Sequence, residues 1–308
     1  MQPNGTYDWA LNIGNHVAGP NTDRVGYAVD VDASGNAYIV GETTPSSSNT
    51  NQRAFIAKFD QNGTLLWHLQ DNSTFQLSGV TPESYARGVA VDSSGAAYIT
   101  GHFKSSIAFG NHQRNQTTSS SLDGFIFKIN PDGTSAWAKK IQASSGSPCM
   151  FNDIEIDSQD YVIMVGGTET TGHTCAFTDN SGTTNIANEK SYIAKLNTST
   201  KQWDWVIGVG YEKVFDVAIG PADEIAVVGG FEALLNPNGT WAWQHPQPGL
   251  SGSSCGNYCP NAVDFDSEGN LFFTGYFQGS MYAGQREGGG NQFIVSAGGT
   301  DIFVRKKA

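Results

Sequence analysis

Five acidic side chains stand at recurrent positions in the sequence and could perform acid–base chemistry or bind a cation. Each lies two or four residues before a turn and alternates with apolar residues. They are Asp30, Asp153, Glu155, Asp216 and Asp264. Clustered carboxylates raise one another's pKa, and glycosidases use pairs of carboxylates as acid and base. The pattern therefore allows a hydrolase, a site for a cation or water, or no specific role.

Other signatures of catalysis and metal binding are missing from the sequence. It contains no G-x-S-x-G elbow, no H-E-x-x-H pair and no glycine-rich phosphate loop. The string from Asp30 to Asn36 begins like a calcium loop, but Gly41 stands where such a loop needs a glutamate. The same turn recurs in four of the five units described below, which favours a β-turn. We expect no catalytic residue, no cofactor and no metal site, apart from a cation bound among the five carboxylates.

Tryptophans recur about once per unit, which predicts packing between neighbouring structural units. They include Trp9, Trp67, Trp137, Trp205 and Trp243. Trp203 and Trp241 are additions to this pattern, two residues before Trp205 and Trp243 and on the same strand face. If the rings of these two residues are exposed, they form an aromatic platform for sugars.

Four cysteines, an even number, favour disulfides and an oxidising compartment. The sequence spacing suggests the pairs Cys149–Cys175 and Cys255–Cys259. A zinc site that adds His173 or His245 is the alternative, although C-x3-C is not the usual zinc knuckle. Six N-x-S/T tripeptides are candidate glycosylation sites, at Asn4, Asn62, Asn72, Asn115, Asn197 and Asn238. The opening MQPNGTYDW has the pattern of a strand, so we expect any targeting segment to have been removed or to lie outside this numbering.

A repeated unit is the strongest signal in the sequence. Its first half, YAVDVDASGNAYIVG at 27–41, recurs at 88–101, 153–166, 216–229 and 262–275. Its second half, FIAKFDQNGTLLW at 55–67, recurs at 125–137 and 192–205 and is shortened at 234–243. Each half consists of two alternating strands around a turn, so one unit predicts four strands and no helix.

The fifth unit ends without its tryptophan strand, and a matching segment, PNGTYDWALNIG, stands near the N-terminus. Radially repeated four-stranded units whose ends complete one blade form a β-propeller. We predict one all-β domain over 1–308, a five-bladed propeller of four-stranded antiparallel blades that is closed by the N-terminal strand. The blades are expected at about 23–70, 83–142, 149–210, 213–245 and 261–308 with 3–14. The first strand of each unit would line the central channel, with the five carboxylates pointing into it.

Two segments, DGFIFKINPDGTSAWAKKI and SAGGTDIFVRKK, resemble the SBBP-type β-propeller repeat of bacteria and archaea. The resemblance covers nearly the whole chain. It departs in the third unit, where GHTCAFTDNSGTTNIANEK is inserted, and in the fourth, which is shortened between Gly230 and Leu234. The resemblance implies an extracellular or cell-envelope propeller, usually without an assigned enzymatic activity, and it transfers no catalytic residues.

The amino-acid composition of the chain indicates which classes of partner to expect. The chain has 29 acidic and 17 basic residues and a net charge of -12, which argues against a nucleic-acid binder. No apolar run has the roughly 18 residues of a membrane span. Charged residues make up only 15% of the chain, which is rich in Asn, Gly, Ser and Thr. A surface of this composition suits packing against copies of the same protein.

These observations predict a non-catalytic, extracellular or cell-surface propeller that acts as a structural or interaction module. It could be a self-assembling subunit of a surface layer, adhesin or filament, with other copies, cell-surface proteins or glycans as partners. The closing strand would come from the same chain by default, or from a neighbouring copy as in donor-strand complementation. The alternatives are a multivalent lectin-like binder and, less favoured, a glycosidase that uses the channel carboxylates.

Overall fold

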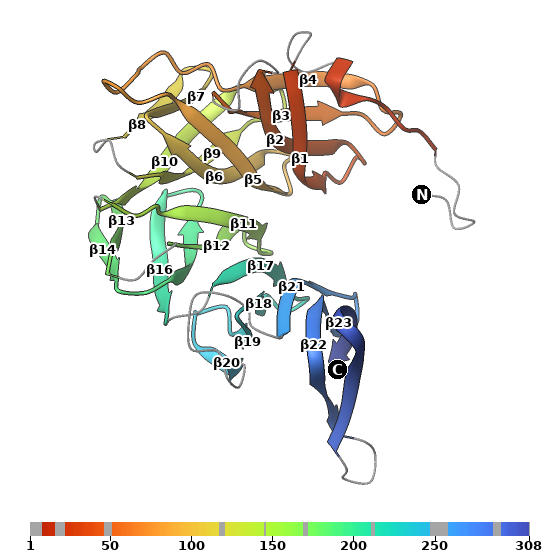
Figure 1. Cartoon of the computed structure of the whole chain (residues 1–308). Helices are drawn as coiled ribbons and strands as arrows, with labels where there is room; N and C mark the ends of the chain where they lie inside the picture. The colour runs from red at the N-terminus through yellow and green to blue at the C-terminus, as the bar shows by residue number, and fades with distance from the viewer. Residues whose placement is uncertain are drawn as a thin grey trace.

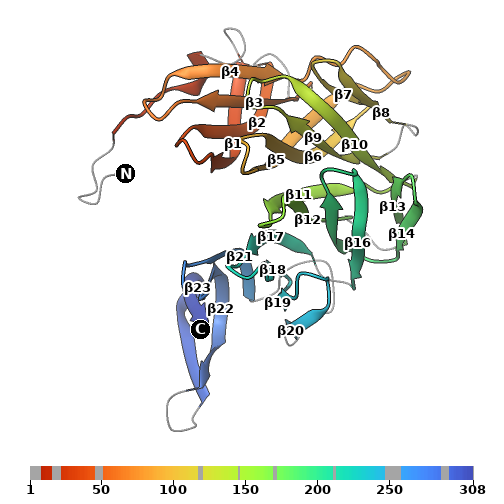
Figure 2. The same cartoon turned by 180° about the vertical axis from the view of Figure 1, so that it is seen from behind.

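The computed structural model describes residues 8–15, 22–45, 51–116, 121–144, 146–168, 172–210, 213–246, 258–285 and 291–307. Within them the chain forms antiparallel strands and one short 3-10 helix, η1 (Ile13–Asn15). Five main sheets follow one another along an open arc, with β1 at one end and β23 at the other (Figures 1 and 2). No helix in these ranges has the length and hydropathy needed to cross a membrane.

The first, third and fourth sheets each have four strands in chain order. The first contains β1 (Thr22–Val31), β2 (Ala37–Pro45), β3 (Arg53–Phe59) and β4 (Leu65–Gln70). The third contains β11 (Met150–Ile156), β12 (Tyr161–Gly167), β15 (Ser191–Asn197) and β16 (Gln202–Val209). The fourth contains β17 (Val214–Ile219), β18 (Ile225–Gly229), β19 (Phe231–Leu235) and β20 (Trp241–Pro246).

The second and fifth sheets depart from four strands. The second contains β5 (Glu83–Val91), β6 (Ala97–Lys104), β9 (Asp123–Ile129) and β10 (Ser135–Ala143). A hairpin, β13 (Thr174–Asp179) and β14 (Gly182–Ala187), extends this sheet beyond β10. A separate hairpin contains β7 (Ser106–Phe109) and β8 (His112–Asn115). The fifth contains β21 (Tyr258–Phe265), β22 (Leu271–Gln285) and β23 (Asn291–Lys307).

The all-β antiparallel architecture predicted from the repeats is confirmed, and the five sheets coincide closely with the five predicted units. Two features differ from the sequence prediction. The described part of the last sheet has three strands, with β23 paired only to β22, and the sheets do not close into a ring. The strands of the third unit's insertion, β13 and β14, do not pair with the sheet of that unit. Instead, β13 pairs with β10 of the second sheet, through Ala143 opposite Cys175.

In four of the five units, the repeated turn is built by an aspartate that accepts backbone hydrogen bonds. In the first unit, Asp32 Oδ1 accepts the N–H groups of Ser34 at 3.0 Å and Asn36 at 2.9 Å. Gly35 provides the positive φ of 77° that the turn needs. These contacts are those of a β-turn.

The turn aspartate also forms a partly buried ion pair with a lysine of the third strand. The pairs are Asp32–Lys58 at 3.2 Å, Asp92–Lys128 at 3.0 Å, Asp157–Lys195 at 2.8 Å and Asp266–Lys306 at 3.6 Å. The repeated lysine of the second half-unit thus has a structural role. In the fourth unit both partners are replaced, by Gly220 and Leu234, which occupy the same positions.

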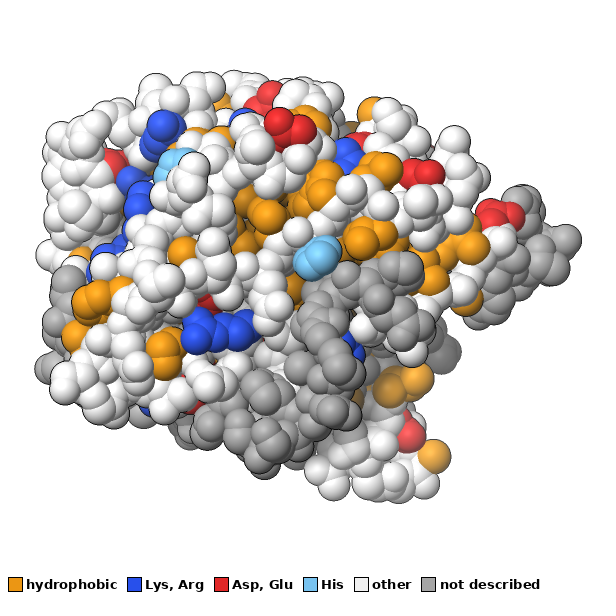
Figure 3. Space-filling view, turned by 90° about the horizontal axis from the view of Figure 1, so that it is seen from above, with side chains coloured by type: hydrophobic (Ala, Val, Ile, Leu, Met, Phe, Trp, Pro, Cys, Tyr) orange, Lys and Arg blue, Asp and Glu red, His pale blue; other side chains and the backbone are white. Residues whose placement is uncertain are grey.

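Charged side chains are few on the face in Figure 3. Most of its described surface is backbone or uncharged polar side chains, and hydrophobic side chains gather in a band from the centre to the right, as expected of a chain with only 15% charged residues.

Candidate functional site

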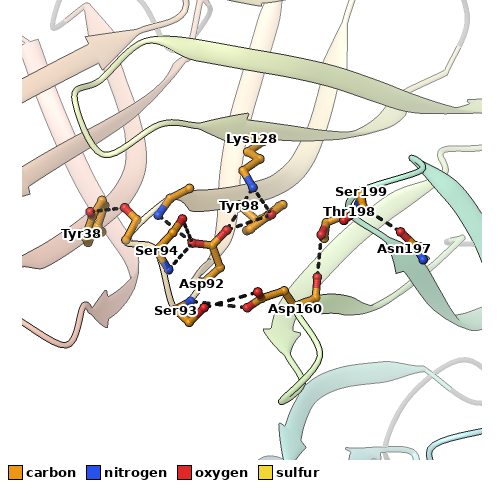
Figure 4. Close-up of polar contacts among 12 residues, drawn as sticks. Tyr38, Asp92, Ser93, Ser94, Tyr98, Lys128, Asp160, Asn197, Thr198 and Ser199 are labelled. Atoms are coloured by element: carbon orange, nitrogen blue, oxygen red, sulfur yellow. Dashed lines mark hydrogen bonds and ion pairs between the residues drawn. The ribbon is translucent and has the colours of Figure 1, made fainter.

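Neighbouring sheets are joined by the turns of their inner strands. The Tyr38 hydroxyl of the first sheet donates to the Gly95 carbonyl of the second at 2.6 Å. Ser93 of the second sheet contacts Asp160 of the third at 3.4 Å, beside the Asp92–Lys128 pair (Figure 4). Ser158 of the third sheet donates to Asp223 of the fourth at 2.7 Å. The same turn therefore provides a polar contact at three successive junctions.

Three of the five predicted carboxylates also join sheets, because each accepts a backbone N–H from the next inner strand. Asp30 accepts from Val91 at 2.7 Å, Asp153 from Val217 at 3.2 Å and Asp216 from Val263 at 2.7 Å. Asp264, in the last sheet, accepts the N–H of Phe265 within its own strand at 2.8 Å. These contacts give the carboxylates a structural function along the inner edge of the arc.

The carboxylates lie close enough to one another to shift their pKa values. Burial and the neighbouring Asp216 raise the pKa of Asp153 well above its usual range. Burial, followed by the charges of Asp30, Asp216 and Asp264, raises the pKa of Glu155 to about 8. The structure thus brings the five predicted residues together. Among the described residues, no group of three or more acidic, His or Cys side chains is arranged to hold a metal ion.

The raised pKa of Glu155 predicts an unusual dependence of stability on pH. Its folded-state value of about 8 exceeds the ordinary 4.5, so the folded state binds more protons and loses stability as pH rises across this window. We expect Glu155→Gln to stabilise the protein at pH 8 by roughly 2–4 kcal/mol and to have little effect near pH 4.5. Calorimetric melting at several pH values would measure this effect.

The control is Glu268→Gln, which changes an exposed glutamate in the β21–β22 turn. It should leave the melting temperature nearly unchanged at every pH. The interpretation of Glu155 is wrong if Glu155→Gln and the wild-type protein melt with the same dependence on pH.

The free face of the first sheet carries exposed apolar residues. At the corresponding positions of the other four sheets, the apolar residues are buried. Val29 is 64% exposed, whereas its equivalents Val89, Ile154, Val217 and Val263 are 6%, 1%, 2% and 7% exposed. Those four residues pack against the preceding sheet. Val31 lies on the same face of this strand and is 60% exposed. We call Val29 and Val31 of β1 the first end face.

The outer side of the last sheet is the opposite half of such a junction. Ile302 and Val304 of β23 are 84% and 75% exposed, and Phe272 of the paired strand is also exposed. Their equivalents in the first sheet are Ala54, Ile56 and Tyr38, which are buried against Val89 and Val91 of the second sheet. We call Phe272, Ile302 and Val304 the last end face.

The segment 8–15 covers the outer part of the first sheet's free face. Leu11 and Ile13 pack against Phe55, Ala57 and Phe59, and the indole N–H of Trp9 donates to the Gln61 carbonyl at 2.9 Å. A Cβ on Gly63 would lie 2.9 Å from the Trp9 ring, so this turn needs glycine for the close approach.

Trp67 and Trp205 make the same contact with the next sheet, because their indoles bond Pro131 at 2.9 Å and Pro237 at 3.4 Å. Trp9 therefore takes the place of an outer-strand tryptophan from a sheet that would precede the first. This agrees with its predicted register. Its predicted pairing with β23 is not seen among the described residues, where β23 pairs with β22 alone.

The cysteines and the two additional tryptophans are the next predicted site residues to place in the structure. Cys149 and Cys175 form the predicted disulfide, whereas Cys255 lies outside the described residues. Trp203 packs edge-on against Phe177 with ring centroids 5.0 Å apart, and Trp241 packs against Phe231 at 6.3 Å. Both tryptophan side chains are partly buried. The two rings therefore contribute to packing and do not form an open platform for sugars.

The predicted glycosylation asparagines differ in exposure. Asn62, Asn72, Asn115 and Asn238 are exposed, and Asn4 lies outside the described residues. Asn197 is partly buried. Its carboxamide accepts the N–H groups of Ser199 and Thr200 and donates to Tyr161 at 2.8 Å, so this side chain is engaged in its turn and is unsuited to modification.

Sequence reasoning missed the two end faces. The repeat did contain the signal, since Val29 and Val31 occupy positions that are apolar in every unit. However, an apolar position predicts burial. The open arc of the structure (Figure 1) is needed to show that no described sheet packs against Val29 and Val31.

The similarity of this chain to known proteins is remote. No family model matches the chain, and no curated protein matches it. A protein of unknown function from Bacteroides caccae shares 10% identity, with a TM-score of 0.46 over 81% of this chain and 70% of its own. A protein of unknown function from Dyadobacter fermentans shares 8% identity, with a TM-score of 0.40 over 94% and 100%. The Dos1 propeller shares 8% identity, with a TM-score of 0.39 over 83% and 63%.

Proposed function

We propose that this protein is a non-catalytic, propeller-type structural module that assembles head to tail with copies of itself, outside the cell or at its surface. The two apolar end faces carry the proposal. Each is half of a junction that recurs between the sheets within the arc, and each is left uncovered at its end.

The two faces complement each other by position. When the last end face meets the first in the geometry of the internal junctions, Ile302 and Val304 contact Val29 and Val31 as Ala54 and Ile56 contact Val89 and Val91. Burial of a valine or isoleucine side chain contributes about 1.5–3 kcal/mol, which makes four such residues a substantial driving force.

A second copy is the occupant that we propose because the faces lie at opposite ends of an open arc (Figures 1 and 2). A contact between two different faces adds one copy per step and produces a string or filament. The segment 8–15 of the added copy would lie beside β23 of its neighbour and supply the fourth strand, a form of strand donation. The disulfide and the exposed sequons support an oxidising, extracellular setting.

The assembly is tested with one blocked variant of each face, Val29→Lys and Val304→Lys, so that the two blocked faces repel each other in a mixture. The wild-type protein should form strings whose length grows with concentration, by light scattering and negative-stain microscopy. Each variant alone should be monomeric, because it retains only one working face. An equimolar mixture should form dimers and nothing longer.

The other outcomes contradict the proposal in distinguishable ways. A wild-type protein that stays monomeric at high concentration indicates closure within one chain. Dimers formed by either variant alone indicate that identical faces meet each other. Phe75→Ser is the matched control because it changes an exposed aromatic residue outside both end faces, and it should assemble like the wild type.

A further inference from the structure

An open pocket of about 560 Å³ lies between the second sheet with its hairpin, β8 and the β15–β16 turn of the third sheet, and its size is typical of ligand sites. Four of its lining residues are cationic, from a chain that has only 17 lysines and arginines and a net charge of -12. They are Arg114, Lys139, Lys140 and Lys201. In Figure 3 most Lys and Arg side chains lie on the left, the side of β8 and β10 in Figure 1.

Two of the cations, Lys139 and Arg114, are held by carbonyl groups, which leave much of their charge uncompensated. Lys139 Nζ donates to the Lys201 carbonyl at 2.9 Å, and the Arg114 guanidinium donates to the carbonyls of Gln113 and Ala138. Lys140 pairs with Asp123 at 3.2 Å. Carbonyl oxygens hold these groups in place but carry no negative charge to neutralise them.

Asp179 is the single carboxylate among the described residues that line the pocket, and both of its oxygens accept hydrogen bonds. One accepts the backbone N–H of Trp203 at 2.7 Å, and the other accepts the backbone N–H of Ser181 at 2.8 Å. With Lys140 matched by Asp123, three cations face one lining carboxylate. The pocket therefore has an excess of positive charge.

The remaining lining residues suit a hydroxylated ligand. Gln142, Thr178, Asn180 and Thr200 offer uncharged hydrogen-bonding groups, and Trp137 adds an aromatic wall. We infer that this pocket binds an acidic glycan, with its carboxylate or sulfate group at the cations and its hydroxyl groups at the amide and hydroxyl side chains. The site is separate from the end faces and does not depend on assembly.

Calorimetric titration tests the inference with four probes: tetragalacturonate, a heparin tetrasaccharide, neutral maltotetraose and inorganic phosphate. We expect one or both acidic oligosaccharides to bind at least tenfold more tightly than maltotetraose and phosphate. Raising the salt concentration should weaken this binding, because salt screens partly exposed charges. Comparison of the first two probes distinguishes carboxylate from sulfate recognition.

Variants locate the binding. Lys139→Gln with Lys201→Gln should weaken binding at least tenfold, whereas Lys213→Gln, which changes a lysine outside the pocket, should not. Val29→Lys, which blocks assembly, should bind like the wild type, so failure of one proposal leaves the other intact. The inference is overturned if maltotetraose or phosphate binds as tightly as the acidic sugars, if no probe binds at millimolar concentration, or if the double variant is unimpaired.

Discussion

Replacing Lys195 with methionine is expected to lower the free energy of unfolding by about 3–5 kcal/mol, the usual cost of leaving one buried charge without its partner. Lys195 Nζ lies 2.8 Å from Asp157, and both side chains are almost completely buried. The same ammonium group donates to the Pro237 carbonyl of the fourth sheet at 3.2 Å. The change therefore removes the partner of a buried carboxylate and a contact between two sheets. Urea unfolding measures the loss.

The chain contains its own control at the same position of another unit. Lys306 pairs with Asp266 at 3.6 Å, and its side chain is 48% exposed. An exposed pair contributes about 0–1 kcal/mol, so Lys306→Met should cost far less than Lys195→Met. Equal losses in the two variants would show that burial of the pair is not what matters.

The fourth unit suggests how the loss could be reversed. Gly220 and Leu234 occupy the positions of the aspartate and the lysine there, and the turn keeps its backbone hydrogen bond between Gly220 and Glu224. Combining Asp157→Gly with Lys195→Leu copies this arrangement. Because it removes both charges, the double variant should recover a large part of the stability lost by Lys195→Met.

The sequence was sufficient to predict the sheets because each strand pair carries its own local signal. The turn of Asp32 and Gly35 has fixed chemistry, and the flanking strands alternate strictly. The alternation also placed Asp153 and Glu155 on the inner edge, where burial and the nearby charge of Asp216 raise the pKa of both carboxyl groups. These properties depend on neighbours in sequence or on the repeat.

Long-range features were not predictable in the same way. The hairpin that begins at Thr174 could have joined either of two sheets, and its pairing with β10 depends on a contact between units. The basic pocket depends on Arg114 and Lys201, which are 87 positions apart by their numbers and belong to no motif. Closure of the arc was predicted from a count of units, and a count does not determine the angle between sheets.

Deleting residues 1–15 is expected to lower the free energy of unfolding by roughly 3–5 kcal/mol, since several partly buried apolar side chains lose their contacts at once. Leu11 and Ile13 would no longer cover the buried ring of Phe59, and the Trp9 indole would lose its hydrogen bond to the Gln61 carbonyl. Thermal unfolding at a concentration low enough to keep the protein monomeric measures the stability of the chain separately from assembly.

Adding a peptide of residues 1–15 should restore the melting temperature, because the covered surface belongs to the first sheet and remains present in the truncated chain. Leu66→Ala is the control, as it removes an exposed leucine from β4 of the same sheet and should change stability by less than about 0.5 kcal/mol. An unchanged melting temperature after the deletion would show that the segment contributes nothing to the first sheet. It would also remove the reason to expect that the segment can serve as the outer strand of a neighbouring copy, because a strand that does not hold its own sheet cannot position itself beside β23 of another.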